Sequence, residues 1–227
     1  MHTWVKRIII EEKFLWRLLV YILGLFIAAF GVAFAINAAL GLSPMNSFPY
    51  VLSLVTGIDM GICVAFLLSF YVLVQIIILG RQFKWIQLGQ LLCAFLFGYF
   101  VDFTRFLLGD FTIPTYFGQL ALLIMSMVCI ATGITLFMSV RLVPLPSEGL
   151  VAAITQKLPN AKFHIVMIIT HTTIVAIGIL LSLLLLGRVY GVREGTVLSA
   201  VLIGKMIPYI RKAVSPILGK LGIAPIE

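Results

Sequence analysis

Charged side chains are scarce in this sequence. Asp, Glu, Lys and Arg make up 11% of the 227 residues, whereas hydrophobic residues make up 62% and the mean hydropathy is +1.19. Soluble domains contain about 25% charged and about 45–50% apolar residues. Because so few charges cannot cover a water-exposed surface, the composition excludes a soluble domain and indicates an integral membrane protein in contact with a lipid bilayer.

Motifs for catalysis and metal binding are missing as well. The cysteines Cys63, Cys93 and Cys129 lie in apolar runs without a CxxC spacing, and no His/Asp/Glu cluster accompanies them. There is no phosphate-binding loop and no GxSG-like nucleophile motif, and Ser147 with His171 would make only a weak catalytic dyad. We therefore expect no enzyme activity, no cofactor and no metal site.

Acidic residues are the rarer of the two charge classes. Sixteen Lys and Arg face eight Asp and Glu, giving a net charge of +8. The cations fall between apolar runs, so the positive-inside rule explains them better than nucleic-acid binding does. With both termini in the cytoplasm, 12 of the 16 cations lie on the cytoplasmic side. We therefore expect this orientation, with the N-terminus and the C-terminus in the cytoplasm.

Six apolar runs are long enough to cross about 30 Å of hydrocarbon. They cover residues 17–38, 62–80, 86–108, 119–140, 164–186 and 195–212. Two shorter runs, 46–57 and 147–158, would reach only about 18 Å as helices, so they cannot span. The sequence predicts an all-α, polytopic bundle of six transmembrane helices within a single membrane domain, 1–227.

The two halves of the chain are similar to each other. Aligning Gly31 with Gly133 matches more than twenty residues without a gap, and a later gap brings Gly89 over Gly195 and Gly98 over Gly204. We expect these six glycines to serve helix packing. The repeats cover about 17–108 and about 119–212. Since each has three crossings, the second is predicted to be inverted relative to the first, a plan common in secondary transporters.

Each predicted short helix begins at a proline. In "LGLSPMNSFP", Gly41 breaks the preceding helix, Ser43 is a suitable N-cap, Pro44 is the first helical residue and Asn46 can reach back to the cap's backbone amide. In "LVPLPSEGLV" the corresponding residues are Pro146, Ser147, Glu148 and Gly149, with Glu148 placed as in a capping box and Gly149 as a helix-break residue.

Two interpretations of these short helices stay open. They either re-enter the membrane and line a pathway, with their positive N-termini facing a polar or anionic solute, or they lie flat at the interface as connectors. The lining candidates are Ser43, Asn46, Ser147, Glu148 and His171.

Other polar side chains lie inside the predicted spans. Gln75 and Gln90 are predicted to form hydrogen bonds between helices. Asp102 and Arg105 are predicted to form a local ion pair on one helix face.

The motifs resemble those of the YczE/YyaS/YitT family of bacterial membrane proteins. The first-half family motif is similar to G-x-G/S-P-W-D, and here Gly41, Ser43 and Pro44 match while Met45 and Asn46 replace Trp-Asp. The second-half motif P-x-D/E-G-L is met at Pro146, Glu148, Gly149 and Leu150, and G-x-x-x-G-T at Gly191, Gly195 and Thr196. The length is similar to the short YczE-type branch. The resemblance implies an architecture and a location in the bacterial cytoplasmic membrane, and it implies no substrate.

Two functions compete on this evidence. The first is a secondary transporter for a small polar or anionic solute, which the inverted repeat and the paired short helices favour. The second is a non-catalytic scaffold that binds another membrane protein or a second copy of the chain. Access of water to both short-helix N-termini discriminates between them.

Overall fold

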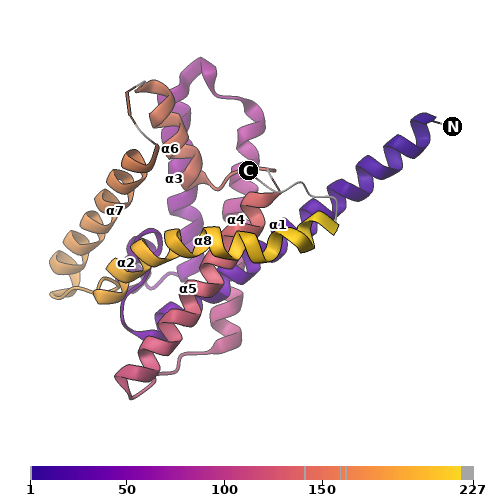
Figure 1. Cartoon of the computed structure of the whole chain (residues 1–227). Coiled ribbons are helices and arrows are strands. Elements are labelled where there is room, and N and C mark those ends of the chain that lie inside the picture. Colours follow the sequence, from indigo (N-terminus) through magenta and orange to yellow (C-terminus); the bar gives the residue numbers. More distant parts are fainter. Residues whose placement is uncertain (1, 141, 159, 162, 221–227) are drawn as a thin grey trace.

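The computed structural model describes residues 2–140, 142–158, 160–161 and 163–220, with the side chains of these residues from Phe14 onward except those of His164 and Lys220. Over these residues the chain is helical and contains no strand. Figure 1 shows the arrangement. The α-helices are α1 (His2–Ala38), α2 (Pro44–Thr56), α3 (Met60–Leu79), α4 (Gly89–Leu108), α5 (Tyr116–Ser139), α6 (Pro146–Lys157), α7 (Phe163–Leu186) and α8 (Glu194–Lys220), with short 3₁₀ turns at Gly80–Gln82 and Trp85–Leu88.

Five of the described helices are long and apolar enough to cross a membrane. These segments are Phe14–Ala38, Met60–Gln82, Trp85–Leu108, Tyr116–Ser139 and Ile165–Leu186. Their outer faces expose large apolar side chains, such as Ile77 at 80% and Phe106 at 85%, which suits contact with lipid. The all-helical membrane fold is therefore confirmed. The crossing predicted for 195–212 stays a prediction, because α8 carries Lys205, Arg211 and Lys212 and is more polar than these five segments.

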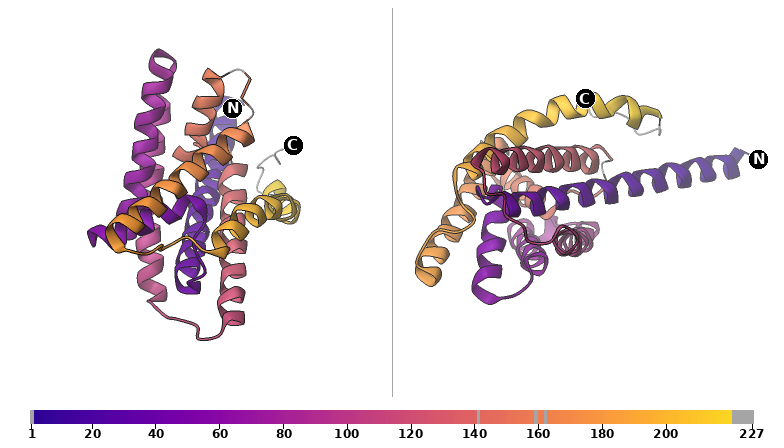
Figure 2. Two further views of the ribbon diagram at one scale, coloured as in Figure 1. Left: turned by 90° about the vertical axis from the view of Figure 1, so that its left-hand side faces the viewer. Right: turned by 90° about the horizontal axis from the view of Figure 1, so that it is seen from below.

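The centre of the molecule is an antiparallel pair, α1 and α5. Gly31 on α1 lies against Ser126, whose hydroxyl donates to the Gly31 carbonyl over 2.7 Å. Gly133 on α5 lies against Gly24, so that a Cβ on Gly133 would stand 2.5 Å from the Gly24 oxygen. The residue numbers rise along one helix as they fall along the other, which makes the pair antiparallel, and small residues let the backbones approach. The two helices run side by side in Figure 2.

The remaining contacts are reciprocal between the two halves. α4 packs on α1 as α8 packs on α5, and α6 packs on α3 as α2 packs on α7. At the junctions, Gly195 lies against the Leu40 carbonyl, and Gly89 at the aligned position makes an ordinary contact with Val143. Elements at equivalent places in the two halves therefore have equivalent neighbours.

One pair of helices departs from this reciprocity. α3 and α4 pack closely, because a Cβ on Gly98 would lie 2.4 Å from the Gly61 carbonyl oxygen, but the space around Gly204 on α8 is open. Gly204 therefore makes no close helix contact within the described chain, and its predicted packing role stays a prediction. The physical reason is that α8 turns away from α7 and crosses α5, as Figure 1 shows.

A carboxylate from α4 caps the start of α3. Asp102 accepts a hydrogen bond of 2.6 Å from the backbone amide of Gly61, in the first turn of α3. Arg105 lies instead 3.7 Å from Asp110. The predicted Asp102–Arg105 ion pair is therefore replaced by a bond between helices, since the free amides at a helix N-terminus favour an acidic side chain.

Candidate functional site

Two breaks separate a long helix from the short, Pro-started helix that follows it, one between α1 and α2 and one between α5 and α6. The first break contains Ala39 and Gly41, which have positive φ angles of 56° and 101°. A Cβ on Gly41 would also stand 2.6 Å from the Arg193 amide nitrogen. Glycine is required at position 41 because the backbone has a positive φ angle and because the segment before α8 approaches closely.

The segment between α7 and α8 holds the first break closed. The Leu42 amide donates to the Gly191 carbonyl over 2.9 Å, and the Gly195 amide donates to the Leu40 carbonyl over 2.8 Å. The Arg193 guanidinium donates to the Ala39 carbonyl over 2.9 Å. We call these three hydrogen bonds the latch. They satisfy backbone groups that the break would otherwise leave free.

Polar side chains at the start of α2 are buried beneath the latch. Ser43 and Asn46 are 9% and 6% exposed. The Asn46 amide nitrogen donates to the Ser43 hydroxyl oxygen over 2.9 Å, whereas the sequence predicted a bond to the backbone amide of the cap. The side-chain oxygen Oδ1 of Asn46 is buried and has no hydrogen-bond partner among the described residues. Pro44 is the first residue of α2.

The second break opens onto a pocket. Its volume is about 200 Å³, and its lining comes from the end of α5, the connecting segment and the first turn of α6. The lining residues are Phe137, Met138, Leu142, Val143, Pro144, Leu145 and Glu148. We call this cavity the α6 pocket. The two breaks thus differ, since the first is held closed and the second borders an open cavity.

Glu148 is the charged residue among the described residues that line the α6 pocket. It is the third residue of α6, after Pro146 at the helix start, and it is half-buried. The Ser147 hydroxyl donates to its carboxylate over 2.9 Å. Burial raises the pKa of Glu148 above its ordinary value, although hydrogen bonds from its own backbone amide and from Ser147 lower it in part. Among the described residues this bond from Ser147 takes the place of the predicted capping box.

Two glutamines from neighbouring helices hold the first turn of α6. Gln75 on α3 and Gln90 on α4 are both fully buried. The Gln75 amide nitrogen donates to the Gln90 side-chain oxygen over 3.0 Å and to the Pro146 carbonyl over 3.1 Å. The predicted role of these side chains as hydrogen-bonding groups between helices is confirmed.

Gly149 has a different role from the predicted helix break. It lies inside α6, and a Cβ there would stand 2.7 Å from the Gln75 side-chain oxygen and 2.8 Å from that of Gln90. The glycine is therefore a point of close approach. The position of Gly149 after Pro146 in the sequence could not predict its contact with Gln75 on α3 and Gln90 on α4.

Tyr21 on α1 is a site residue that the sequence analysis missed. Its hydroxyl donates to the Val143 carbonyl over 3.1 Å, and its ring packs edge-on against Phe137 with centroids 6.1 Å apart. It fixes the wall of the α6 pocket. No local signal could have identified it, because its hydrogen-bond partner is 122 residues away in the chain.

The predicted lining residues fall into separate places. Ser43 and Asn46 lie together at the first break, and Ser147 and Glu148 lie together at the second. His171 is half-buried on α7 and is outside the lining of the α6 pocket. Their role in contacting a solute stays a prediction.

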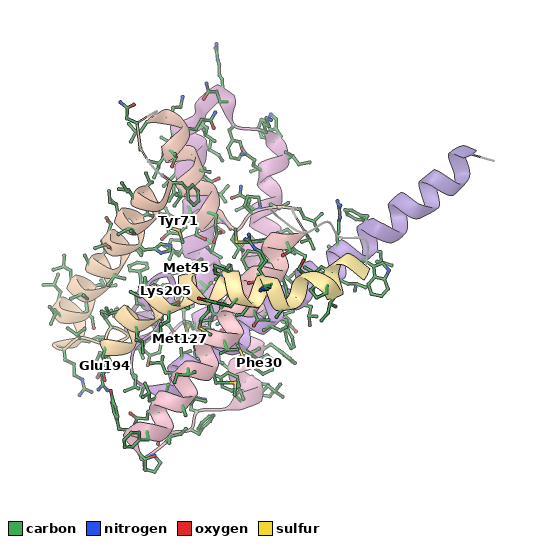
Figure 3. The ribbon with its side chains drawn as sticks, in the orientation of Figure 1. Phe30, Met45, Tyr71, Met127, Glu194 and Lys205 are labelled. Carbon is green, nitrogen blue, oxygen red and sulfur yellow. The ribbon has the colours of Figure 1, made fainter. Side chains whose placement is uncertain are left out.

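Charges at the start of α8 lie away from the α6 pocket. Arg193 and Glu194 form an ion pair of 3.0 Å with both side chains about half exposed. Figure 3 labels Glu194 at the first turn of α8 and Lys205 farther along the same helix. Among the described residues, no group of three or more His, Cys, Asp or Glu side chains is placed to hold a metal ion.

Comparison with known proteins places the chain in a family. Residues 15–212 match a family of unknown function, DUF6198. A 152-residue stretch is 30% identical to the uncharacterized membrane protein YczE of Bacillus subtilis (strain 168), covering 65% of this chain and 66% of that protein. The chain thus spans about two thirds of the length of this relative. No solved structure matches the chain. On the strength of the long family match and the resemblance to YczE, the chain belongs to the DUF6198 family of membrane proteins.

Proposed function

We propose that this chain is a secondary transporter for a small solute. It would cross the membrane six times, as two inverted repeats that meet along α1 and α5. The antiparallel contact of Gly31 with Ser126 and of Gly133 with Gly24 supports this proposal, because the contacting positions correspond under the alignment of the halves. In inverted-repeat transporters, substrate sites lie where interrupted helices meet.

The observation that carries the proposal is the difference between the two breaks. The first break is tied to the segment before α8 by the latch, and the second borders the α6 pocket. A carrier that works by alternating access has one entrance closed while the other is open. With both termini in the cytoplasm, the closed break faces outward and the open pocket faces the cytoplasm.

Cysteine accessibility tests this proposal. In a variant without the three native cysteines, Asn46→Cys and Glu148→Cys are introduced separately and probed with membrane-impermeant thiol reagents from each face. We expect the cysteine at 148 to react from the cytoplasmic side, and the cysteine at 46 to react slowly from outside. Adding Arg193→Ala, which removes one bond of the latch, is expected to speed labelling at 46 and to slow it at 148.

The same labelling experiment has an outcome that would contradict the transporter. If Arg193→Ala neither speeds labelling at 46 nor slows labelling at 148, the two breaks are uncoupled, the short helices are interfacial connectors and no alternating pathway exists. Arg193→Lys is the matched control, because it keeps the positive charge while changing the guanidinium that bonds to Ala39.

A scaffold role is the second candidate, and α8 is the observation that favours it. α8 packs on α5 and leaves open space around Gly204, whereas α4 at the equivalent place packs closely on α3. A partner membrane protein or a second copy would find an uncovered helix face there. Co-purification of a partner at fixed stoichiometry, lost on Gly204→Trp, would support this candidate.

A further inference from the structure

The α6 pocket combines apolar walls with a single acid. Of the seven described residues that line it, six are apolar and the seventh is Glu148. Phe137 and Leu145 are 3% and 5% exposed and form the deep part of the pocket, while Met138 at 41% lies toward its rim. A bound molecule would therefore meet hydrocarbon on most sides and a carboxylate on one.

The positive end of α6 does not favour an anion at this place. Glu148 is in the first turn of α6, where a carboxylate interacts favourably with the helix dipole. It also accepts the hydrogen bond from Ser147. The protein's own carboxylate thus takes the position that an anionic ligand would need, and a second anion would be repelled by it.

We infer that the α6 pocket binds a small organic cation, in which an ammonium group is attached to an apolar body. The ammonium would make a charge-assisted hydrogen bond to Glu148, and the apolar body would contact Phe137 and Leu145. At about 200 Å³ the pocket is smaller than the 300–1,000 Å³ typical of sites for drug-sized ligands, which limits the ligand to a small amine or to the head of a larger molecule.

This inference rests on the proposed function in naming the transported solute, and it changes the predicted small polar or anionic solute to a cationic one. The binding of the cation and its transport are separate measurements. Binding to purified protein without flux into liposomes would leave the pocket assignment intact and overturn the transporter. Flux of the cation into liposomes that does not depend on Glu148 would support the transporter and overturn the pocket assignment.

The test uses three matched probes with the full chain purified in detergent. These are 2-phenylethylammonium, 2-phenylethanol and 3-phenylpropanoate, which share a body and differ in charge. Isothermal titration is expected to show the cation binding about tenfold or more tightly than the alcohol, because the alcohol can still donate a hydrogen bond to Glu148 but lacks the positive charge that pairs with the carboxylate. Tighter binding of the anion than of the cation would overturn the inference.

Substitutions test whether Glu148 causes the preference for the cation. We expect Glu148→Gln to weaken cation binding about tenfold and Glu148→Asp to weaken it less. Glu194→Gln is the matched control, since it removes an exposed acid at the start of α8 and should leave binding unchanged. Met138→Trp narrows the rim without touching the carboxylate, so it is expected to weaken cation and alcohol alike and serves if Glu148→Gln does not fold.

An ammonium group could come from a free amine or from a lipid headgroup. Displacement of 2-phenylethylammonium by short-chain phosphatidylethanolamine assigns the pocket to the lipid headgroup, and no displacement by this lipid assigns it to a free amine. Either result upholds a cation site. Displacement by short-chain phosphatidylglycerol, which has no ammonium, contradicts it.

Discussion

At the residue scale, the clearest features are glycines and acids whose partners lie far away in the chain. Gly133 allows the backbones of α1 and α5 to touch, and Gly149 allows α6 to approach two glutamines. Asp102 caps a helix 41 residues earlier in the chain. The glycine alignment of the two halves identified Gly31 and Gly133 as equivalent positions, but spacing within one segment could not show which helix Asp102 or Gly149 would meet.

The first prediction concerns Gly133. In Gly133→Ala the new Cβ would lie 2.5 Å from the Gly24 carbonyl oxygen and 2.7 Å from the Ala28 amide nitrogen, and backbone atoms cannot move aside cheaply. We expect a loss of stability of about 1–3 kcal/mol, as for overpacked sites. Thermal unfolding in detergent measures this loss. Gly204→Ala is the control with the same chemical change in open space, and equal destabilisation of the two variants would refute the α1–α5 contact.

The second prediction concerns the protonation of Glu148. Because burial raises its pKa, the carboxyl takes up a proton at a higher pH than an exposed Glu does. Binding of 2-phenylethylammonium needs the ionised form, so we expect affinity to fall as pH drops through the raised pKa. Titratable neighbours are Tyr21 on α1, which interacts with Glu148, and Cys93 on α4 beside Tyr21. Titration calorimetry across pH measures the profile, and Glu148→Gln should flatten it.

At the element scale, the two short helices share a design and differ in how they are held. Each begins at a proline directly after a break in a long helix. The segment that leads into α2 is held by the latch, and α6 is held by Gln75 and Gln90 next to an open pocket. The prolines made the helix starts predictable, since proline suits the first helical position. The latch was not predictable, because it joins groups on residues about 150 positions apart in the chain, such as the Arg193 guanidinium and the Ala39 carbonyl.

The third prediction tests how α6 is held. Gln75→Leu removes the donor to the Pro146 carbonyl and to Gln90, leaving buried acceptors without partners. The expected cost is about 1–3 kcal/mol in thermal unfolding. Gln75→Leu combined with Gln90→Leu should cost less than the sum of the two single variants, because together they remove both members of the pair. Additive costs would contradict a direct Gln75–Gln90 interaction.

At the scale of the whole molecule, the number of crossings decides the architecture. Five segments meet the length and apolarity needed to span, and α8 is the sixth candidate. An even number of crossings places both ends of the chain on one side of the membrane, and an odd number places them on opposite sides. The positive-inside bias favours the even number.

The fourth prediction follows from this parity. Fusion of a reporter that is active only in the cytoplasm is expected to give activity at both the N-terminus and the C-terminus. The same reporter inserted after Asp110, between α4 and α5, is expected to be inactive. A C-terminal fusion that is inactive beside an active N-terminal one would mean that α8 does not cross. The six-span inverted repeat would then be wrong, and the scaffold candidate would gain support.

The sequence by itself determined the membrane class, the helix positions and the short helices. These follow from apolar run length, charge scarcity and proline, which act locally along the chain. The tertiary structure decided which break is closed, what Gly149 and Asp102 contact, and that Glu148 lines an apolar pocket beside Tyr21. Such features depend on contacts between distant segments. The partner of each such residue is set only when the helices pack, because hydrogen-bond geometry and burial depend on how the helices are arranged.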